Sequence, residues 1–312
     1  MICILVFALQ APAQQSVPSA SSSADAWVKY GVESAQNGDM TTAMSSFEAA
    51  IKADPRWVAA YECRGQIYLQ QNNLDAAMAD FTQAIQIDPK YAEAYYNRGV
   101  ISAEKGDFDG ALSDFNRTIE LNSKYSPAYY NRGHVKYFKA DLDGAIADLD
   151  QAITLNPSSP FSYFIRGLAR LAKDDREGAT TDFQQSATNG YPNAALWLWI
   201  VETENGDRGV ARIDLSDFLS KPQLFKPDDW PTQIGNFLLE KITQDQLMAK
   251  AKENVSNPYS TSEAWFYSGM ARHFAGDTKG ALACFQQAIA TGSKVIEISV
   301  EAQREVTLLQ QP

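Results

Sequence analysis

Four arginines at a constant interval are the first residues in this chain that could carry chemistry: Arg64, Arg98, Arg132 and Arg166. A regular row of guanidinium groups would suit the binding of an anion. However, each arginine is followed, always at the same distance along the chain, by an aspartate: Asp80, Asp114, Asp148 and Asp182. This constant spacing favours pairing between arginine and aspartate over a stripe open to an anionic ligand.

Two further repeats of the same register provide an internal control. Where the arginine would stand, the first repeat has Tyr30 and the last has Ser268. Where the aspartate would stand, they have Ser46 and Cys284. Both members of the pair are therefore lost together, as expected if a partly buried guanidinium without its carboxylate is costly. We expect the four Arg–Asp pairs to be structural.

The other chemistry-bearing residues form no catalytic or metal-binding motif. The chain has two histidines, His134 and His273, and no His or Cys pair at the spacing of metal ligands. It also has no glycine-rich phosphate loop after a strand. Cys63 and Cys284 are many repeats apart, so we expect two separate buried thiols. The sequence predicts no enzyme, no metal and no cofactor.

The elements that position these residues repeat with the same period as the arginines. Large aromatic, Gly, Ala and Phe or Leu residues recur at positions 4, 8, 20 and 24 of each unit, as in Tyr61, Gly65, Ala77 and Phe81. This spacing predicts two amphipathic helices in each unit, packed closely where Gly and Ala remove side-chain bulk. An Asp or Asn in the turn is placed to cap the second helix, and prolines such as Pro89 follow its end.

This pattern, with its period of about 34 residues, resembles the tetratricopeptide repeat (TPR). The resemblance implies an all-α fold, a TPR solenoid of helix-turn-helix units wound into a right-handed superhelix with a C-terminal capping helix. We expect sixteen helices, as eight antiparallel pairs, between residues 24 and 295. The predicted segments are a signal peptide (1–13), a flexible linker (14–23), five TPR units (24–193), two degenerate and distorted helical pairs (194–261), a TPR unit (262–295) and the capping helix (296–312).

The segment from about residue 190 to 310 carries a narrower resemblance. Its Leu196-Trp-Leu-Trp-Ile run, the block from Trp230 to Leu247, the late single repeat and the final helix resemble the C-terminal half of the NlpI-type envelope lipoproteins. Members of that family act as adaptors for peptidoglycan hydrolases and a periplasmic protease. The lipobox cysteine of such lipoproteins is missing, because Cys3 comes too early in the chain.

The N-terminus and the overall charge limit where the protein acts and what it binds. The apolar run from Ile2 to Leu9, followed by Ala11-Pro12-Ala13, predicts a secretory signal cleaved after Ala13, although no Lys or Arg precedes it. We expect a periplasmic or secreted protein, or a cytoplasmic one if this leader does not function. The net charge of −11 argues against nucleic acid and against direct binding to an anionic membrane.

The resemblance implies that positions 2, 5, 6, 9, 12 and 13 of each first helix line a concave groove. The groove residues predicted in this way are Tyr96, Asn97, Val100, Tyr130, Asn131, His134, Tyr137, Phe138, Phe164 and Leu168. We expect the row Tyr96, Tyr130 and Phe164 to be exposed, and the preceding Tyr95, Tyr129 and Tyr163 to be buried. The Lys and Arg residues of a carboxylate clamp are missing from these positions, so apolar anchors for a peptide are favoured. The competing interpretation is that the row packs within the superhelix.

Together these features predict a non-catalytic scaffold or adaptor that binds a protein or peptide through its groove, in the bacterial cell envelope. No small-molecule substrate and no nucleic acid are expected, and a membrane would be reached only by indirect association. Two alternatives stay open. One is an accessory factor of a peptidoglycan-processing or envelope-assembly enzyme, and the other is a cytoplasmic TPR protein.

Overall fold

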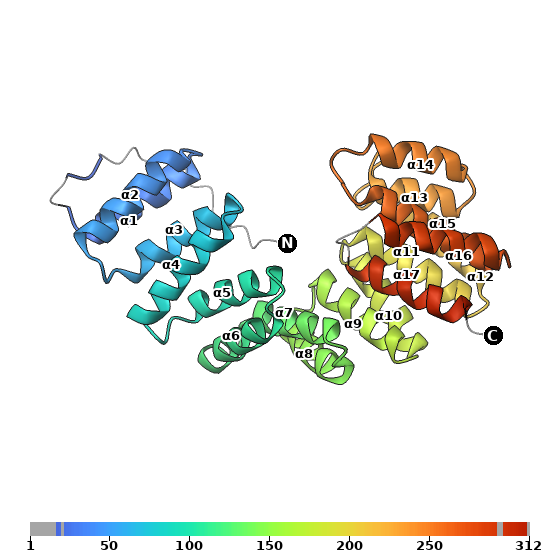
Figure 1. Ribbon diagram of the computed structural model, residues 1–312, viewed down its shortest axis with the longest axis horizontal. Helices are drawn as coiled ribbons and strands as arrows, with labels where there is room; N and C mark the ends of the chain where they lie inside the picture. The colour runs from blue at the N-terminus through green and yellow to red at the C-terminus, as the bar shows by residue number, and fades with distance from the viewer. Residues whose placement is uncertain (1–16, 20–21, 292–295, 311–312) are drawn as a thin grey trace. The chain divides into compact units, whose positions relative to one another are not determined.

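The computed structural model describes residues 17–19, 22–291 and 296–310 of the chain (Figure 1). These residues form seventeen α-helices and no strand, so the all-α prediction is confirmed. Sixteen of the helices lie between residues 24 and 290, as the repeat register predicts. The predicted signal peptide lies outside the described residues, as does half of the predicted linker. The chain divides into two compact units, unit 1 (1–156) and unit 2 (157–312).

Unit 1 consists of four helical pairs, coloured blue to green in Figure 1. The helices are α1 (Ala24–Gln36), α2 (Met40–Ala53), α3 (Val58–Gln70), α4 (Leu74–Ile87), α5 (Ala92–Glu104), α6 (Phe108–Leu121), α7 (Ser126–Phe138) and α8 (Leu142–Leu155). Each helix packs against its neighbours in sequence, and first helices of adjacent pairs also touch, as α5 and α7 do. The apolar core of unit 1 therefore runs along the array from pair to pair.

The turn within each regular pair ends in a capping side chain. Asp107 accepts a hydrogen bond from the backbone N–H of Gly110, at 3.0 Å, at the start of α6. The same contact, from an Asp or Asn to the third residue of the helix, starts five other second helices: α2, α4, α8, α10 and α16. These caps satisfy backbone donors that the first helical turn leaves unpaired, so the predicted capping role is confirmed.

The glycine at position 8 allows the two helices of a pair to approach closely. A Cβ atom built on Gly99 would lie 2.9 Å from the ring of Phe115 and 3.1 Å from Cβ of Asp114. At Gly269 the corresponding distance, to the ring of Phe285, is 2.5 Å. Distances this short mean that any larger residue would force the helices of the pair apart.

Unit 2 contains nine helices among the described residues. They are α9 (Pro160–Ala172), α10 (Arg176–Thr188), α11 (Pro192–Glu204), α12 (Arg208–Leu219), α13 (Trp230–Leu238), α14 (Gln244–Glu253), α15 (Ser260–Phe274), α16 (Thr278–Ala290) and α17 (Ile296–Leu309). The helices α13 and α14 are shorter than those of the regular pairs, in line with the predicted distortion. Pro231 stands in the first turn of α13, where its missing N–H costs nothing.

The helix α11 is buried on all sides, unlike the first helices of unit 1. Every residue from Ala194 to Thr203 is buried. This helix contacts its sequence neighbours α10 and α12 and also the later helices α13 and α15. The sequence predicts contacts between neighbouring repeats, and α11 departs from that rule because its apolar run, Leu196 to Val201, needs cover around the whole helix.

A buried carboxylate links the distorted pairs of unit 2. Glu263 in α15 accepts hydrogen bonds from the indole N–H of Trp230, at 2.6 Å, and from the amide of Asn257, at 2.8 Å. These bonds hold the start of α13 and the loop before α15 against one buried oxygen atom. They supply polar contacts where the repeat motif is missing.

The last helix, α17, packs on α16 and α15. Its buried residues Ile298, Ala302 and Val306 recur every four residues on one face, as expected for a helix that covers the end of the array. Among the described residues, no helix is both long enough and apolar enough to cross a membrane.

Candidate functional site

All four predicted Arg–Asp pairs are formed, each between the two helices of one unit. Arg98 donates from Nε and Nη2 to the two carboxylate oxygens of Asp114, both at 2.8 Å. The other three pairs have the same two-bond geometry, at distances of 2.5 to 2.9 Å: Arg64–Asp80, Arg132–Asp148 and Arg166–Asp182. The aspartates are buried. The hydrogen bonds hold the pKa of Arg64 and Arg98 above the usual value of an arginine.

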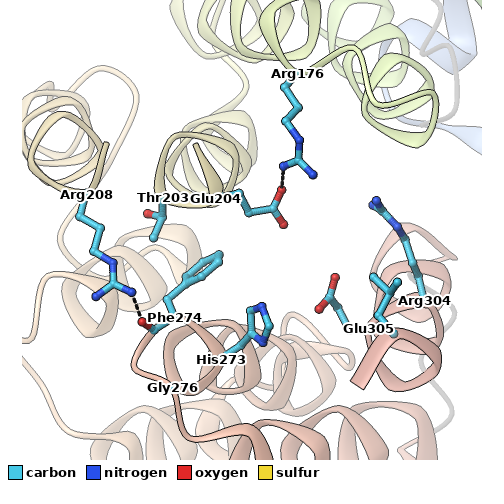
Figure 2. A pocket seen from close by; sticks show the side chains of 10 residues that line it. Arg176, Thr203, Glu204, Arg208, His273, Phe274, Gly276, Arg304 and Glu305 are labelled. Carbon is cyan, nitrogen blue, oxygen red and sulfur yellow. Dashed lines mark hydrogen bonds and ion pairs between the residues drawn. The ribbon is translucent and has the colours of Figure 1, made fainter. Parts of the chain in front are cut away.

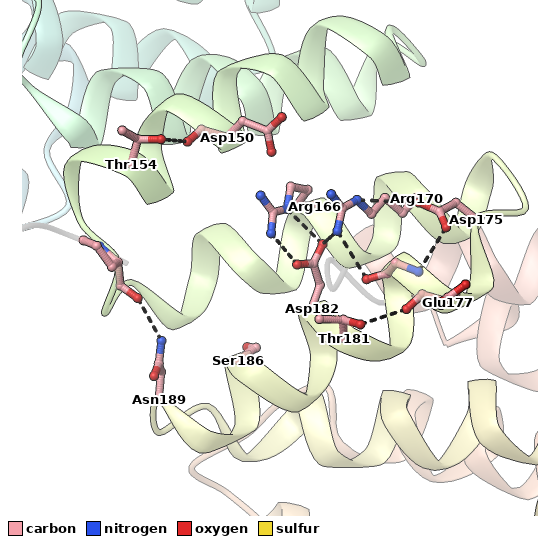
Figure 3. A network of polar contacts seen from close by, with 12 residues as sticks. Asp150, Thr154, Arg166, Arg170, Asp175, Glu177, Thr181, Asp182, Ser186 and Asn189 are labelled. Atoms are coloured by element: carbon pink, nitrogen blue, oxygen red, sulfur yellow. Dashed lines mark hydrogen bonds and ion pairs between the residues drawn. The ribbon is translucent and has the colours of Figure 1, made fainter.

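Figure 3 shows how the pair in unit 2 is extended. Arg166 and Arg170 both donate to Asp182, which is fully buried, and Arg170 also lies near Asp175, the cap of α10. In the outer repeats, which lack the pair, Ser46 and Ser268 are themselves buried. Ser46 stands at the aspartate position of the first repeat, and Ser268 stands at the arginine position of the last.

The pairs also explain why the tyrosines at position 4 are not fully buried. The guanidinium carbon of Arg98 lies 5.6 Å from the ring centre of Tyr95, and Tyr129 and Tyr163 have the same arrangement with their arginines. These three tyrosines are only partly buried, so the expectation of full burial is wrong. Each ring lies at the edge of the helical pair, beside a cation.

Four of the predicted groove residues lie in the core instead of on a surface: Tyr96, Tyr137, Phe164 and Leu168. Tyr96 is 7% exposed, because the ring of Tyr125 lies 5.0 Å away and Phe115 lies 6.1 Å away. The expected exposure of Tyr96 and Phe164 is therefore wrong. Tyr125, which precedes the first helix of the next pair, covers the ring of Tyr96.

Phe164 is covered in the same way, within unit 2. Its ring lies 4.9 Å from Tyr191, 5.7 Å from Phe183 and 6.2 Å from Trp197. The residue is 4% exposed. The interpretation in which the aromatic row packs inside the array therefore describes Tyr96 and Phe164 correctly.

The six remaining predicted residues are partly exposed and share one face of unit 1. This α5–α7 face consists of Asn97, Val100, Tyr130, Asn131, His134 and Phe138. Along α7, the ring of His134 lies 5.8 Å from Tyr130 and 4.4 Å from Phe138, so the three rings form a column. Phe138 also stacks on Phe108 of α6, at 6.2 Å. A partly exposed aromatic column offers apolar contact area with few rotatable bonds.

The two asparagines flank this column with hydrogen-bonding groups. Asn131 donates one N–H to the hydroxyl of Tyr96, at 3.0 Å, which fixes the orientation of its amide between α7 and α5. Asn97 stands at the equivalent position of the preceding pair. An amide held in this way can pair with a peptide backbone without first being ordered.

Unit 2 contains a polar hollow of about 470 Å³ that sequence reasoning missed (Figure 2). Arg176, Glu204, His273 and Arg304 converge on it from α10, α11, α15 and α17. Arg176 donates to Glu204, and Arg208 donates to the backbone carbonyl of Phe274. Burial raises the pKa of Glu305, which also lines the hollow. The only feature of the sequence that points to this hollow is its set of arginines in an acidic chain.

Two cysteines lie in the described part of the chain, and neither is placed for chemistry. Cys63 and Cys284 are free thiols. Burial raises the pKa of Cys63 to about 12 and also raises that of Cys284, which keeps both sulfurs protonated and weakly nucleophilic at neutral pH. Within the described part of the chain, no group of three or more His, Cys, Asp or Glu side chains is placed to hold a metal ion.

Family comparisons agree with this repeat geometry. The tetratricopeptide repeat models match residues 24–56, 92–125 and 126–159, and a related TPR repeat model matches residues 65–105. Tetratricopeptide repeats are present between residues 24 and 159. No curated protein sequence matches the chain.

Solved structures show the same fold across more of the chain. A tetratricopeptide repeat protein from Parabacteroides merdae matches 92% of this chain and 99% of its own, with 17% identity and a TM-score of 0.52. PilW, a type IV pilus biogenesis factor, matches 67% of this chain and 96% of its own, with 19% identity and a TM-score of 0.58. PilF from Pseudomonas aeruginosa is similar over 67% of this chain and 95% of its own, at 18% identity and a TM-score of 0.57. At these identities the likeness concerns the fold alone.

Proposed function

We propose that this protein is a non-catalytic scaffold that binds a polypeptide partner through the α5–α7 face. The observation that carries the proposal is the column of Tyr130, His134 and Phe138, whose rings stay partly exposed although the equivalent Tyr96 and Phe164 are buried. Partly exposed aromatic rings next to fixed amides are typical of surfaces that bind peptides.

The chemistry of this face favours a segment with apolar side chains and an accessible backbone. Val100 and Phe138 offer apolar contacts, while Asn97 and Asn131 can pair with backbone groups. A clamp for a terminal carboxylate would need basic side chains among these six residues, and they include none apart from His134.

A cross-linking experiment tests this proposal in living cells. A photoreactive phenylalanine analogue at position 130 or 138 should cross-link to one discrete partner, which mass spectrometry then identifies. The matched control places the same analogue at Lys124, an exposed residue outside the face. Equal labelling from positions 124 and 130 would show that the face is not selective.

Substitutions then separate binding from folding. Tyr130→Ala and Phe138→Ala should each weaken partner binding by about 1–3 kcal/mol while changing the melting temperature little. Tyr96→Ala should instead cost about 3 kcal/mol of stability, because it leaves a cavity in the core. If the Tyr130 and Phe138 variants melt early and still bind the partner, the column is packing and the proposal is wrong.

We further propose that the scaffold acts in the cell envelope. The support is the sequence pattern of residues 2–13 and the resemblance of residues 190–310 to the NlpI-type lipoproteins. Cell fractionation combined with N-terminal sequencing tests this. A mature chain in the periplasmic fraction that begins at Gln14 is the expected result, and an uncleaved chain in the cytoplasm would overturn it.

A further inference from the structure

A second surface of unit 2, which the sequence did not indicate, combines an apolar hollow with basic side chains. The hollow has a volume of about 220 Å³, and its apolar walls come from Trp199, Phe237, Leu238, Ala271 and Phe274. Four helices, α11, α12, α13 and α15, contribute to it. A volume of this size admits one large apolar side chain.

A second hollow, of about 400 Å³, adjoins the first at Arg212. It is lined by Arg212, Ile213, Ser216, Leu239 and Lys241. Ile213 is 69% exposed, one of the most exposed large apolar residues in the described chain. The neighbouring Gly209 also faces open space, since a Cβ atom added there would meet no atom within 4 Å. We call the lining of the two hollows the α12 face.

The charge of the α12 face is opposite to that of the whole protein. The chain carries a net charge of −11, yet Arg208, Arg212 and Lys241 line this face and Glu240 is its single carboxylate. Arg208 and Arg212 are four residues apart, on the same side of α12. A basic face favours a partner that carries negative charge.

Glu240 occupies the place that a carboxylate of such a partner would take. It pairs with Arg212 at 3.1 Å, and the two side chains are 82% and 50% exposed, so the pair contributes little to stability and exchanges readily. Glu240 also has a φ of +59°, in the left-handed region that favours glycine. Glu240 therefore occupies a position whose backbone conformation favours glycine.

We infer that the α12 face binds an acidic peptide segment with one bulky apolar residue. The apolar side chain enters the hollow between Trp199, Phe237 and Phe274. Flanking carboxylates of the peptide pair with Arg212 and Lys241 and displace Glu240. This surface lies in unit 2, so it is separate from the α5–α7 face of unit 1 and adds a second partner site to the scaffold.

Fluorescence anisotropy with a labelled peptide of sequence Gly-Asp-Asp-Phe-Asp-Asp-Gly tests the inference on the full chain. The peptide should bind, and a version with Lys for each Asp, or with Ala for Phe, should bind at least ~10-fold more weakly. Binding should also weaken as salt rises, because the contacts are between exposed charges. Equal binding of the acidic and basic peptides would overturn the inference.

Variants of the protein locate the site. Arg212→Glu combined with Lys241→Glu should lower affinity at least ~10-fold, whereas Arg117→Glu combined with Lys124→Glu, an equal charge change in unit 1, should not. Glu240→Gly removes the competing carboxylate and relaxes the backbone, so it should tighten binding. An unchanged affinity in both Glu240→Gly and the Arg212/Lys241 variant would show that the peptide does not use this face.

Two further measurements check the fold of the variant and the chemical class of the partner. Circular dichroism melting should show that the Arg212/Lys241 variant stays folded, since both side chains are exposed. Vesicles that contain phosphatidylglycerol test a lipid surface as the anionic partner. Binding to those vesicles without binding to the peptide would contradict the inference.

Discussion

At the scale of single residues, the Arg–Asp pairs are the polar contacts that most strongly define each repeat. Each guanidinium donates two hydrogen bonds to a buried carboxylate and lies over the tyrosine one turn before it. The two hydrogen bonds occupy one edge of each guanidinium, and the aspartate balances its charge. This pairing favours a structural role for the arginines over anion binding.

A double-mutant cycle on Arg98 and Asp114 measures this role. Arg98→Ala alone should destabilise the protein by about 3 kcal/mol, because it leaves a buried carboxylate without its partner. Removing Asp114 as well should cost less than the sum of the two single changes by about 1–2 kcal/mol. Chemical denaturation of the four proteins gives these values. The exposed pair Arg117–Glu120 is the control, with an expected coupling below about 1 kcal/mol. Additive losses at Arg98 and Asp114 would mean that the pair is not a unit.

At the scale of helices, the close approach within a pair depends on its glycine. Gly269→Ala should destabilise the protein by about 1–3 kcal/mol, because the new Cβ would overlap the ring of Phe285. Gly209→Ala is the matched control in a helix, where the added methyl meets open space and should stabilise by ~0.5 kcal/mol. Thermal melting of both variants checks that Gly269→Ala lowers the stability of the protein and that Gly209→Ala raises it. A stabilising Gly269→Ala would show that Phe285 moves aside freely.

The contact between α11 and α12 includes a carboxyl group that titrates near neutrality. Burial, then the neighbouring Asp214, raises the pKa of Glu202 from 4.5 to about 7. The folded protein therefore holds this proton more tightly than the unfolded chain does. Stability from this group is present below pH 4.5 and falls, by up to about 3 kcal/mol, as pH rises to 7 and above.

Glu202→Gln tests this pH dependence. The amide can still donate to Asp214 but carries no charge, so the variant should match the wild type near pH 5 and be more stable at pH 8. Melting temperatures across this range give the comparison. A difference in melting temperature between Glu202→Gln and the wild type that does not change with pH would contradict a raised pKa of Glu202.

At the scale of the whole molecule, the two units are built differently. In unit 1 each helix contacts only near neighbours in the chain, as a one-dimensional array does. In unit 2, α11 and α13 also contact α15, so a segment of low repeat quality is enclosed by helices from later in the chain. A local disturbance should therefore spread further in unit 2.

Hydrogen exchange measured by mass spectrometry tests this difference. Gly99→Ala should raise exchange in α5 and α6 and in the adjoining α4 and α7. Gly269→Ala should raise exchange in α15 and α16 and also in α11, α13 and α17, which contact α15. A uniform rise over all helices in either variant would show that the chain unfolds as one cooperative body.

The helices, the repeat register and the Arg–Asp pairs could all be predicted from the amino-acid sequence. These features depend on contacts within one helix or one pair, which recur in successive units and so can be checked against each other. The caps of the second helices and the glycines at position 8 were predictable for the same reason.

Which residues remain at the surface, in contrast, depends on the packing of distant helices. Tyr96 and Phe164 occupy the same helical position as Tyr130, yet residues of the next pair cover the first two, whereas Tyr130 is partly exposed. The α12 face likewise requires α15 to pack against α11, a helix from a much earlier part of unit 2. Helical periodicity indicates which side of a helix is apolar, but burial depends on which distant helix covers that side.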